Sequence, residues 1–557
     1  MTDHILVAVA WPYANGPLHL GHIAGAYLPA DIFARYNRII GNKVLMVSGS
    51  DSHGTPITIR ADAENTTPEK IFSRYHKDFQ ESWEGLNISW DLFTTTDTEN
   101  HHEVSQRIFT NLLDNDLLYE AKADLPYSVK EKRYLPDRYI VGTCPNCGSE
   151  NARGDQCEEC GRTLDPQDLI NPRSTTDGSI PEFRERSHFM FRLSRFEDTL
   201  KEWLEDKTFW RPNVLNQTTG LLEQGLKDRA ITRDLSWGIQ VPVDGWEDRR
   251  IYVWFEAVIG YLSASIEWAK EVAKDPDQWK NWWNEESKSY YFIGKDNIPF
   301  HTIIWPAMLL AYEEGLPLPH NVPSNEFLNL ESGQFSTSRN WAVWVSDYLS
   351  RYEADPLRYV LSATMPETSD SEFTWRDFVR RNNNELVGTY GNLVHRTLTF
   401  LQNNFDGTVP EVELQKPSND LIGDANKALL TSGEYLSECN FRASLKTAMD
   451  LCQQGNRYLD DREPWKAIKT DRNHAAETMF TMLHVISTLK ILFYPFLPES
   501  SQKLHGYLGE TGLVESKGWK STPLIPGDKL PKPEPLFQKL DEEKVVSDET
   551  QRMKKNA

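Results

Sequence analysis

Short apolar runs alternate with helical patterns along the first hundred residues. Ile5 to Ala10 is almost wholly apolar and includes β-branched residues, which is typical of a strand buried on both faces of a parallel sheet. A Pro/Gly-containing turn follows, then a helical stretch from Ala24 to Ile40 and a second strand candidate from Lys43 to Ser48. This order predicts a doubly wound, Rossmann-like α/β domain, which places ligands at the carboxyl ends of its strands.

The strand pattern stops near residue 118. Residues 118–235 contain a cysteine cluster and charged turns, so we interpret them as an insertion that splits the α/β domain. Buried-strand composition returns at Arg250 to Phe255 and at Tyr290 to Ile293, where we expect the parallel sheet to resume.

After about Asp377 the apolar positions recur at helical spacing, as in the series Leu386, Tyr390, Val394, Leu398 and the series Met479, Met482, Val485, Leu489, Leu492. A closing α-helical bundle is therefore expected. The segment from Pro531 mixes Lys, Glu and Pro, and we expect it to be solvated or loosely docked. The predicted division is 1–117 and 236–325 for the two halves of the α/β domain, 118–235 for the inserted connective domain, 326–380 for a linking region, 381–530 for the bundle and 531–557 for a tail.

Composition narrows the class of protein. The chain has 557 residues, 39% of them hydrophobic, which excludes a disordered or fibrous protein. Subtracting 82 acidic from 60 basic residues gives a net charge of −22, which argues against non-specific polyanion binding but leaves a local basic groove open. The N-terminus has no secretory pattern, and the apolar segment 484–497 falls short of the ~18 residues that a membrane helix needs. We expect a cytoplasmic protein with no membrane partner.

Four of the six cysteines form two close pairs. The spacing is C-x2-C-x9-C-x2-C, with Gly148 and Gly161 after the pairs, as a knuckle turn requires. Four thiolates at this spacing fit one tetrahedral Zn²⁺, and a closed set of protein ligands indicates a structural site. Two disulfides or free thiols fit the spacing less well. The predicted ligands are Cys144, Cys147, Cys157 and Cys160, whereas Cys439 and Cys452 are expected to be buried thiols.

His19 and His22 follow the first strand and its turn, where a helix would begin. A spacing of three places both on one helical face, and Gly21 between them lets a ligand approach the backbone closely. Helix N-terminal amides favour phosphate, so the pair is suited to a nucleotide triphosphate. The competing interpretation is a pair of packed histidines.

The turn Trp11 to Pro17 followed by His19-Leu20-Gly21-His22 resembles the first signature of the class I aminoacyl-tRNA synthetases. In that family a later loop carries a lysine–serine signature, and residues 334–339 occupy the matching place. Both signature lysines are absent, replaced by Gln334 and Thr337, which leaves Arg339 as the nearest cation for a pyrophosphate. The resemblance implies catalytic roles for His19, His22, Ser336, Ser338 and Arg339, and ATP contacts for Asn15, Gly21 and Thr337.

Three further stretches, 49–56, 252–261 and 292–301, resemble the methionyl-tRNA synthetases within that class. The resemblance implies that Asp51 holds the substrate ammonium group and that Gly294 and Asp296 hold the ATP ribose. Apart from the resemblance, aromatic rings are suited to binding a thioether, because each sulfur–aromatic contact contributes ~0.3–1.5 kcal/mol. The alternative interpretation of these aromatic residues is ordinary core packing. The residues implied to enclose methionine are Trp11, Tyr13, Trp254, Ala257, Val258, Tyr261, Asn297 and His301.

In the predicted bundle, Asn392 and Arg396 are four residues apart on one helical face, and Trp465 follows a proline. Flat donors beside an indole are able to read single-stranded bases, with stacking worth ~1–3 kcal/mol per base. The family resemblance implies that these three residues contact the anticodon. Without it, a capping Asn, a surface Arg and a packed Trp are the simpler interpretation.

The resemblance covers about residues 5–535 and implies a function. The expected enzyme uses ATP with Mg²⁺ to activate L-methionine as methionyl-adenylate, then transfers it to the 3′-terminal adenosine of tRNA(Met). The isoleucine, valine and leucine enzymes carry a larger insertion, and the cysteine enzyme needs an active-site zinc that no nearby cysteine supplies. A catalytically impaired relative, or one with a non-tRNA acceptor, stays open because of Gln334 and Thr337. We expect a monomer.

Overall fold

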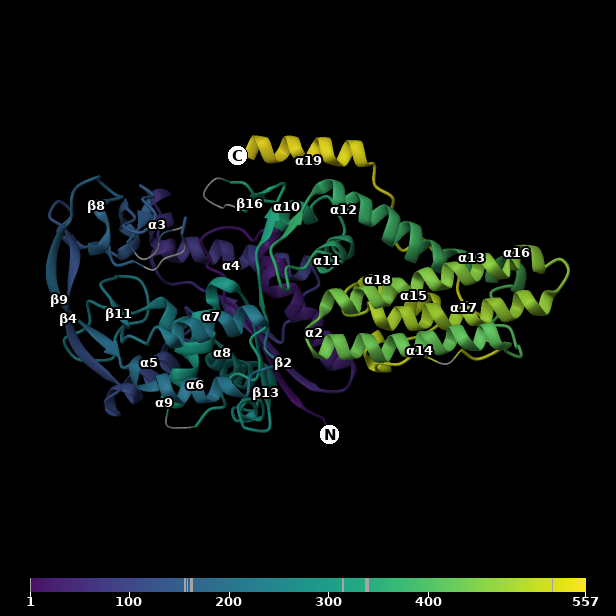
Figure 1. The fold of residues 1–557 in the computed structure, drawn as a ribbon, viewed down its shortest axis with the longest axis horizontal. Helices are drawn as coiled ribbons and strands as arrows, with labels where there is room; N and C mark the ends of the chain where they lie inside the picture. Colours follow the sequence, from purple (N-terminus) through teal and green to yellow (C-terminus); the bar gives the residue numbers. More distant parts are fainter. Residues whose placement is uncertain are drawn as a thin grey trace.

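The computed structural model describes residues 2–154, 157, 159–160, 164–312, 315–335, 340–522 and 524–556. At its centre lies a five-stranded parallel sheet in the order β14-β13-β1-β2-β3 (Figure 1). Two strands in the middle of this order, β13 and β1, pair directly although about 280 residues separate them in sequence, with Ile5 opposite Lys288. The predicted split α/β architecture is therefore confirmed. The strands are β1 (His4–Val9), β2 (Lys43–Ser50), β3 (Leu92–Thr95), β13 (Lys288–Gly294) and β14 (Ser324–Asn325).

Alternate residues of β1 enter two different hydrophobic cores. Val7 and Val9 pack with α2 and α4, whereas Leu6 and Ala8 pack with α5, α8 and α9. Because successive side chains of a strand point to opposite faces, both faces of the sheet are covered by helices. The continuous apolar run in the sequence is the signature of this arrangement. The helices are α2 (Leu28–Ile39), α4 (Pro68–Gly85), α5 (Glu99–Asp114), α8 (Val253–Trp268) and α9 (Trp305–Ala311).

One strand prediction is wrong. Only Arg250–Ile251 of the expected strand from Arg250 to Phe255 is extended, and this short β12 pairs with β11 (Thr232–Arg233) outside the main sheet. Helix α8 begins at Val253, and Phe255 is buried on it. A short apolar run with β-branched residues has the same composition in a buried helix as in a buried strand, so its pattern cannot separate the two. The other prediction, Tyr290 to Ile293, is confirmed in β13.

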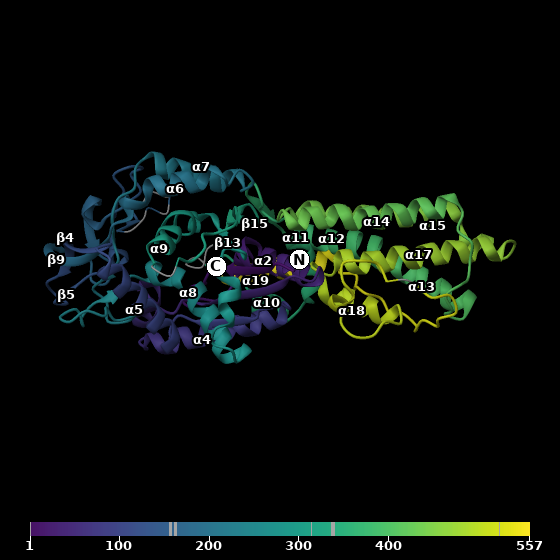
Figure 2. The same cartoon turned by 90° about the horizontal axis from the view of Figure 1, so that it is seen from below.

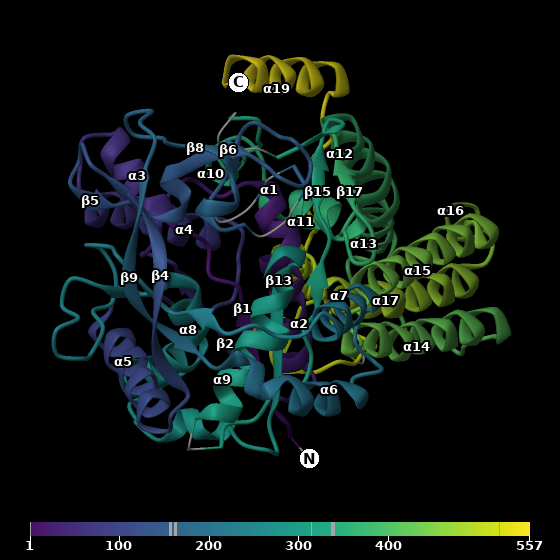
Figure 3. The same cartoon turned by 60° about the vertical axis from the view of Figure 1, so that its left-hand side comes forward.

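The insertion is built on a long antiparallel ribbon of β4 (Leu118–Ser128) and β9 (Glu182–Phe191), which lies on the left in Figure 1 and comes forward in Figure 3. A three-stranded sheet between these two strands in sequence carries the cysteines. The other elements of the insertion are β5 (Arg133–Tyr134), β6 (Ile140–Thr143), β7 (Ala152–Arg153), β8 (Ile170–Ser174), α6 (Glu197–Glu205), α7 (Pro212–Glu223) and β10 (Arg229–Ala230), whereas α3 (Thr55–Ala63) precedes it in the chain.

The helical bundle forms the opposite end of the molecule (Figures 1 and 2). The predicted apolar series are buried, with Leu386, Tyr390 and Met482 fully inaccessible to solvent. Helix α17 has the length and hydropathy to cross a membrane, and 89% of its 18-residue apolar window is buried inside the protein. Its helices are α13 (Asn392–Phe405), α14 (Lys416–Ser437), α15 (Phe441–Arg462), α16 (Pro464–Ala467), α17 (Arg472–Phe493) and α18 (Pro498–Tyr507).

A buried charged cluster joins the bundle to the sheet domain. Arg358 of α11 (Ala354–Ala363) is 1% exposed and donates to Asp31 Oδ2 at 2.6 Å and to the carbonyls of Phe496 and Pro495. Asp31 also accepts from Arg35, four residues along α2. Each buried charge thus has hydrogen-bonded partners, which a buried charge requires.

Of the two possibilities expected for the tail, solvated or loosely docked, the structure shows a docked segment. Residues 542–556 form the helix α19 (Glu542–Asn556), which runs back across the linking region above α10 and α12 (Figures 1 and 3). Phe537, Val545, Glu549 and Met553 are buried. The high content of Lys and Glu in this segment suggested a solvated or loosely docked tail. A helix needs only one stripe of apolar residues to dock, however, and the charged residues then lie on its other faces. The linking elements are β15 (Leu328–Leu330), β16 (Gly333–Gln334), α10 (Val345–Leu349), β17 (Ser371–Phe373) and α12 (Trp375–Arg381).

Candidate active site at the carboxyl ends of the strands

Three strands deliver the predicted residues to one edge of the sheet. The turn after β1 is tied to the loop after β2, since Asp51 N donates to Pro12 O at 2.8 Å and Ala14 N donates to Asp51 O at 2.9 Å. Ala10 N donates to Phe292 O of β13 at 3.0 Å. Asp51 is therefore fixed between the turn and the sheet, with 3% of its surface exposed.

The two signature histidines stack on each other. Their ring centroids lie 3.7 Å apart, and the backbone N–H of His19 donates to His22 Nδ1 at 3.2 Å. His22 therefore carries its proton on Nε2. Burial lowers the pKa of His22 to about 4. Burial and the neighbouring His22 ring hold the pKa of His19 well below its usual range. Both rings are neutral near pH 7.

Phe335, at the start of the predicted second signature, contacts His19 of the first signature. The ring of Phe335 stacks on His19 at 4.8 Å, and a Cβ added to Gly21 would lie 3.0 Å from the His19 ring and 3.4 Å from Phe335. Gln334 ends strand β16 and is exposed. The predicted residues Ser336, Thr337, Ser338 and Arg339 lie outside the described part of the chain.

Helix α8 presents an aromatic wall to the same edge. Trp254 Nε1 donates to the hydroxyl of Tyr13, and Phe300 packs edge-on against Trp254 at 4.6 Å. Asn297 O accepts from His301 Nδ1 at 2.8 Å, which leaves Nε2 to accept from Tyr261 Oη at 2.7 Å. Trp254, Ala257, Val258 and Tyr261 share one face of the helix because their spacings are three and four.

Trp11 occupies a slot between two glycines. A Cβ at Gly49, at the end of β2, would lie 2.2 Å from the indole, and a Cβ at Gly260 of α8 would lie 2.6 Å from it. Any larger residue at either position must displace the indole or the backbone. Tertiary packing therefore sets the position of Trp11 between the sheet and α8.

A buried polar network beneath Asp51 was missed from the sequence. Glu256 of α8 is fully buried and bonds His53 Nδ1 at 2.8 Å and His101 Nε2 at 2.6 Å. Burial raises the pKa of Asp51, and the Glu256 charge raises it further. Burial lowers the pKa of His53, but Glu256 and Asp97 outweigh it and raise that pKa to about 10. A lone Glu inside the apolar stretch 252–261 was the available signal.

The remaining ATP candidates lie at the end of β13 and in the first turn. Gly294 has open space where a Cβ would stand, and Asp296, two residues later, is exposed. Lys295 between them is paired with Glu326 and Asp370 at 2.8 and 2.9 Å. Asn15 lies in the turn after β1 and is partly exposed.

The four predicted cysteines converge. Cys144 Sγ lies 3.9 Å from Cys160 Sγ, and Cys147 Sγ lies 3.6 Å from Cys157 Sγ. These separations exclude disulfide bonds of ~2.05 Å and match the ~3.8 Å between thiolates that each lie ~2.3 Å from a tetrahedral zinc. Asn146 N also donates to Cys144 Sγ at 3.4 Å, as thiolate ligands favour. The site is compatible with Zn²⁺.

Of the three predicted anticodon residues, Arg396 and Trp465 contact each other. The Arg396 guanidinium lies over the Trp465 ring at 5.2 Å and donates to Asp460 at 3.1 Å. Trp465 is 40% exposed although large aromatic side chains are usually buried. Asn392 is exposed one helical turn before Arg396 on α13.

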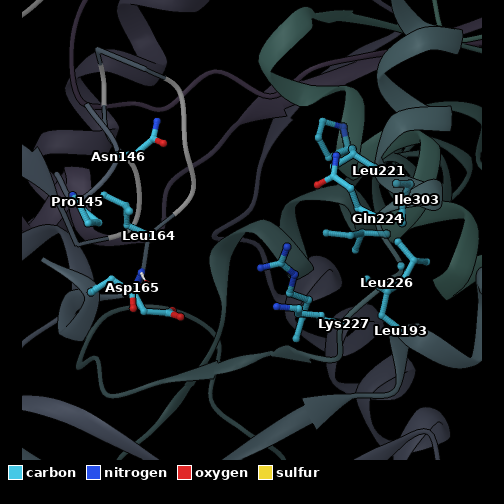
Figure 4. Close-up of a pocket in the computed structure, with 15 residues that line it drawn as sticks. Pro145, Asn146, Leu164, Asp165, Leu193, Leu221, Gln224, Leu226, Lys227 and Ile303 are labelled. Carbon is cyan, nitrogen blue, oxygen red and sulfur yellow. Dashed lines mark hydrogen bonds between the residues drawn. The ribbon is translucent and has the colours of Figure 1, made fainter. Parts of the chain in front are cut away.

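A separate cavity of about 1120 Å³ lies between the cysteine knuckle and the end of α7 (Figure 4). Asn146 and Asp165 line its knuckle side, while Leu226, Lys227 and Ile303 line the other.

The fold and the strand-end cluster define a class I aminoacyl-tRNA synthetase. Residues 5–398 match the family model described as tRNA synthetases class I (M), and residues 409–555 match the anticodon binding domain of methionyl tRNA ligase. The chain belongs to the methionyl-tRNA synthetase family.

Similar full-length proteins agree. The chain is 55% identical to the methionine–tRNA ligase of Dehalococcoides mccartyi strain 195, which spans 99% of this chain and 100% of that protein. It is 51% identical to the methionine–tRNA ligase of Roseiflexus sp. strain RS-1, with 99% of each covered. A solved Mycobacterium tuberculosis methionyl-tRNA synthetase in complex with methionyl-adenylate superposes with a TM-score of 0.80 at 25% identity, covering 96% of this chain and 100% of that one.

Proposed function

We propose that this protein activates L-methionine with ATP to form methionyl-adenylate and pyrophosphate, and then transfers the methionyl group to the 3′-terminal adenosine of tRNA(Met). The observation that carries the proposal is the meeting of a buried carboxylate, Asp51, with the Tyr13–Trp254 aromatic pair and the His19–His22 stack at one sheet edge. This set is suited to holding an amino acid beside a triphosphate.

Each group has a physical role in the proposed step. Burial and the Glu256 charge raise the pKa of Asp51, and a substrate ammonium group would stabilise the ionised form and so bind tightly. The substrate carboxylate supplies the nucleophile, so no covalent enzyme intermediate is needed. The neutral rings of His19 and His22 would donate hydrogen bonds to the α-phosphate as charge develops on it.

The side-chain pocket is proposed to consist of the aromatic wall and its polar end. Trp11, Tyr13, Trp254 and Tyr261 would supply polarizable contacts for the thioether. His301 is held neutral, because burial lowers its pKa to about 4. A neutral ring bonded to a phenol leaves no charge opposite the apolar substrate. Ala257, Val258 and Asn297 complete the proposed lining, and Gly294, Asp296, Asn15 and Gly21 the proposed ATP contacts.

Two metals are part of the proposal. One Zn²⁺ held by the four cysteines would stabilise the knuckle and take no part in the chemistry, since its four ligands leave no open position. Mg²⁺ would enter with ATP and neutralise the phosphates. With glutamine and threonine at the signature-lysine positions, Arg339 is the cation that we propose for the pyrophosphate.

The test is amino-acid-dependent ATP–pyrophosphate exchange with the purified protein and Mg²⁺, scanned across the twenty amino acids. We expect exchange with methionine alone, followed by charging of tRNA(Met) when it is added. A folded, zinc-loaded sample that exchanges with no amino acid would instead support the catalytically impaired relative, which the replacement of both signature lysines favours.

A further inference from the structure

Glu256 is a buried carboxylate in an otherwise apolar helix. Its relative exposure is 0%, and its neighbours on α8 include Phe255, Val258 and Ile259, all in the hydrophobic core. An ionised group in such a place is costly unless it is fully bonded. Burial raises the pKa of Glu256, but the His53 charge and the hydrogen bond from His101 overcome this and lower the pKa to about 2.

The two oxygens of Glu256 bond different parts of the molecule. Oε1 accepts from His53 Nδ1 at 2.8 Å, and His53 belongs to the loop after β2 that carries Asp51. Oε2 accepts from His101 Nε2 at 2.6 Å, and His101 belongs to α5. The carboxylate therefore connects three elements, the loop after β2, α5 and its own helix α8.

The connection leads directly to the proposed substrate groups. The backbone N–H of His53 donates to Asp51 Oδ1 at 3.3 Å, so moving His53 moves this donor. His101 Nδ1 bonds Ser263 Oγ on α8 at 2.7 Å, and its ring lies 6.2 Å from Trp11. Glu256 is thus hydrogen-bonded directly to His53, which orients Asp51, and to His101, which flanks Trp11.

We propose that Glu256 is a positioning residue for amino-acid activation, which fixes the Asp51 carboxylate relative to the aromatic wall of α8. This inference rests on the proposed function, because it assigns Asp51 to the substrate ammonium and the wall to its side chain. The hydrogen bonds of Glu256 go to His53 and His101, so it positions Asp51 through His53, in addition to the direct effect of its charge on the pKa of Asp51.

The test is Glu256→Gln, which keeps the shape of the side chain but loses the charge and one acceptor. In methionine-dependent ATP–pyrophosphate exchange we expect the KM for methionine to rise about 10-fold, with kcat and the KM for ATP changed less than 3-fold. The matched control is Glu477→Gln in the bundle, where another buried carboxylate accepts from Ser418 and Arg462. It is expected to lower stability and leave the KM for methionine unchanged.

A double variant separates positioning from a general structural role. If Glu256 acts through the histidines, His101→Asn raises the KM for methionine by itself, and adding it to Glu256→Gln raises the KM no further. His101→Asn also provides the measurement if Glu256→Gln does not fold. An unchanged KM in both single variants, or equal losses in the kinetics of methionine and ATP, would overturn the inference while wild-type exchange upholds the proposed function. An inactive wild type would overturn both.

Discussion

Glu549 of the C-terminal helix accepts from Arg351 Nε and Nη2 at 2.9 and 2.8 Å across 198 residues of sequence. Arg351 follows α10, and at the start of α10 Val345 N donates to Leu18 O at 2.9 Å. Leu20 N donates in turn to Val343 O at 3.2 Å. The last helix of the chain therefore binds Arg351, just after α10, and the start of α10 binds the backbone on either side of His19.

The docking of α19 predicts a stability effect. Glu549→Gln is expected to destabilise the protein by about 2 kcal/mol, below the 3–5 kcal/mol of a fully broken buried pair, because Arg351 keeps Asp347 as a partner. The measurement is the urea midpoint of unfolding. Asp548→Asn, on the exposed side of the same helix, should shift it little. Equal midpoints for the two variants would contradict the docking.

The buried cluster at Asp31 predicts a pH dependence. Burial alone would raise the pKa of Asp31, but Arg35 and Arg358 outweigh it and hold the pKa well below its usual range. A carboxyl with a lowered folded-state pKa stabilises fully above the unfolded value of ~3.9, and this is lost as pH falls through the folded value. Asp31→Asn should therefore be less stable than wild type at pH 7, with a difference that shrinks below about pH 4.

The measurement for Asp31 is thermal unfolding of both proteins from pH 7 to pH 3. Asp424→Asn, an exposed substitution on α14, serves as the control and should follow wild type throughout. A difference between Asp31→Asn and wild type that stays constant with pH would show that the charge of Asp31 is not its source.

The cysteine geometry predicts the metal content. We expect one zinc per chain by elemental analysis, and well below one in Cys157→Ser, because three thiolates bind less tightly than four. Proteolysis should then cut the knuckle first, while methionine-dependent exchange persists. Cys452→Ala, at a buried thiol of the bundle, should keep one zinc. Full zinc in Cys157→Ser would refute the ligand set.

The slot around Trp11 predicts an effect on substrate affinity. Gly260→Ala places a methyl group 2.6 Å from the indole, so Trp11 must shift relative to α8. We expect the KM for methionine in pyrophosphate exchange to rise at least 5-fold. Gly220→Ala on α7, where a Cβ meets nothing within 4 Å, should leave it unchanged. The same KM in both variants would place Trp11 outside the substrate pocket.

The exposed Trp465 predicts a separation of the two half-reactions. Trp465→Ala should lower the rate of tRNA(Met) charging about 5- to 150-fold, the equivalent of ~1–3 kcal/mol of base stacking, with adenylate formation unchanged. Phe209→Ala, at an aromatic residue that is 54% exposed in the inserted domain, should change neither rate. Normal charging by Trp465→Ala would remove this residue from the anticodon site.

Features with a local signal were predictable from the amino-acid sequence. The run Ile5 to Ala10 is apolar at every position because both faces of its strand are buried, and the bundle repeats its apolar residues because one stripe of each helix is. The spacing of the cysteines likewise indicated that four thiolates converge on one site. The order of the signature motifs along the chain was enough to identify the family.

Contacts between distant segments became visible in the folded protein and not in the sequence. Whether Val253 to Phe255 is strand or helix depends on what packs around it, because the same apolar composition suits both. Glu549 of α19 finds its partner in Arg351 of a distant segment, and the charge of Glu256 is tolerated because two histidines from other elements bond to it. Such contacts join residues far apart in the chain, so no local pattern records them, and long-range packing selects among the conformations that local sequence permits.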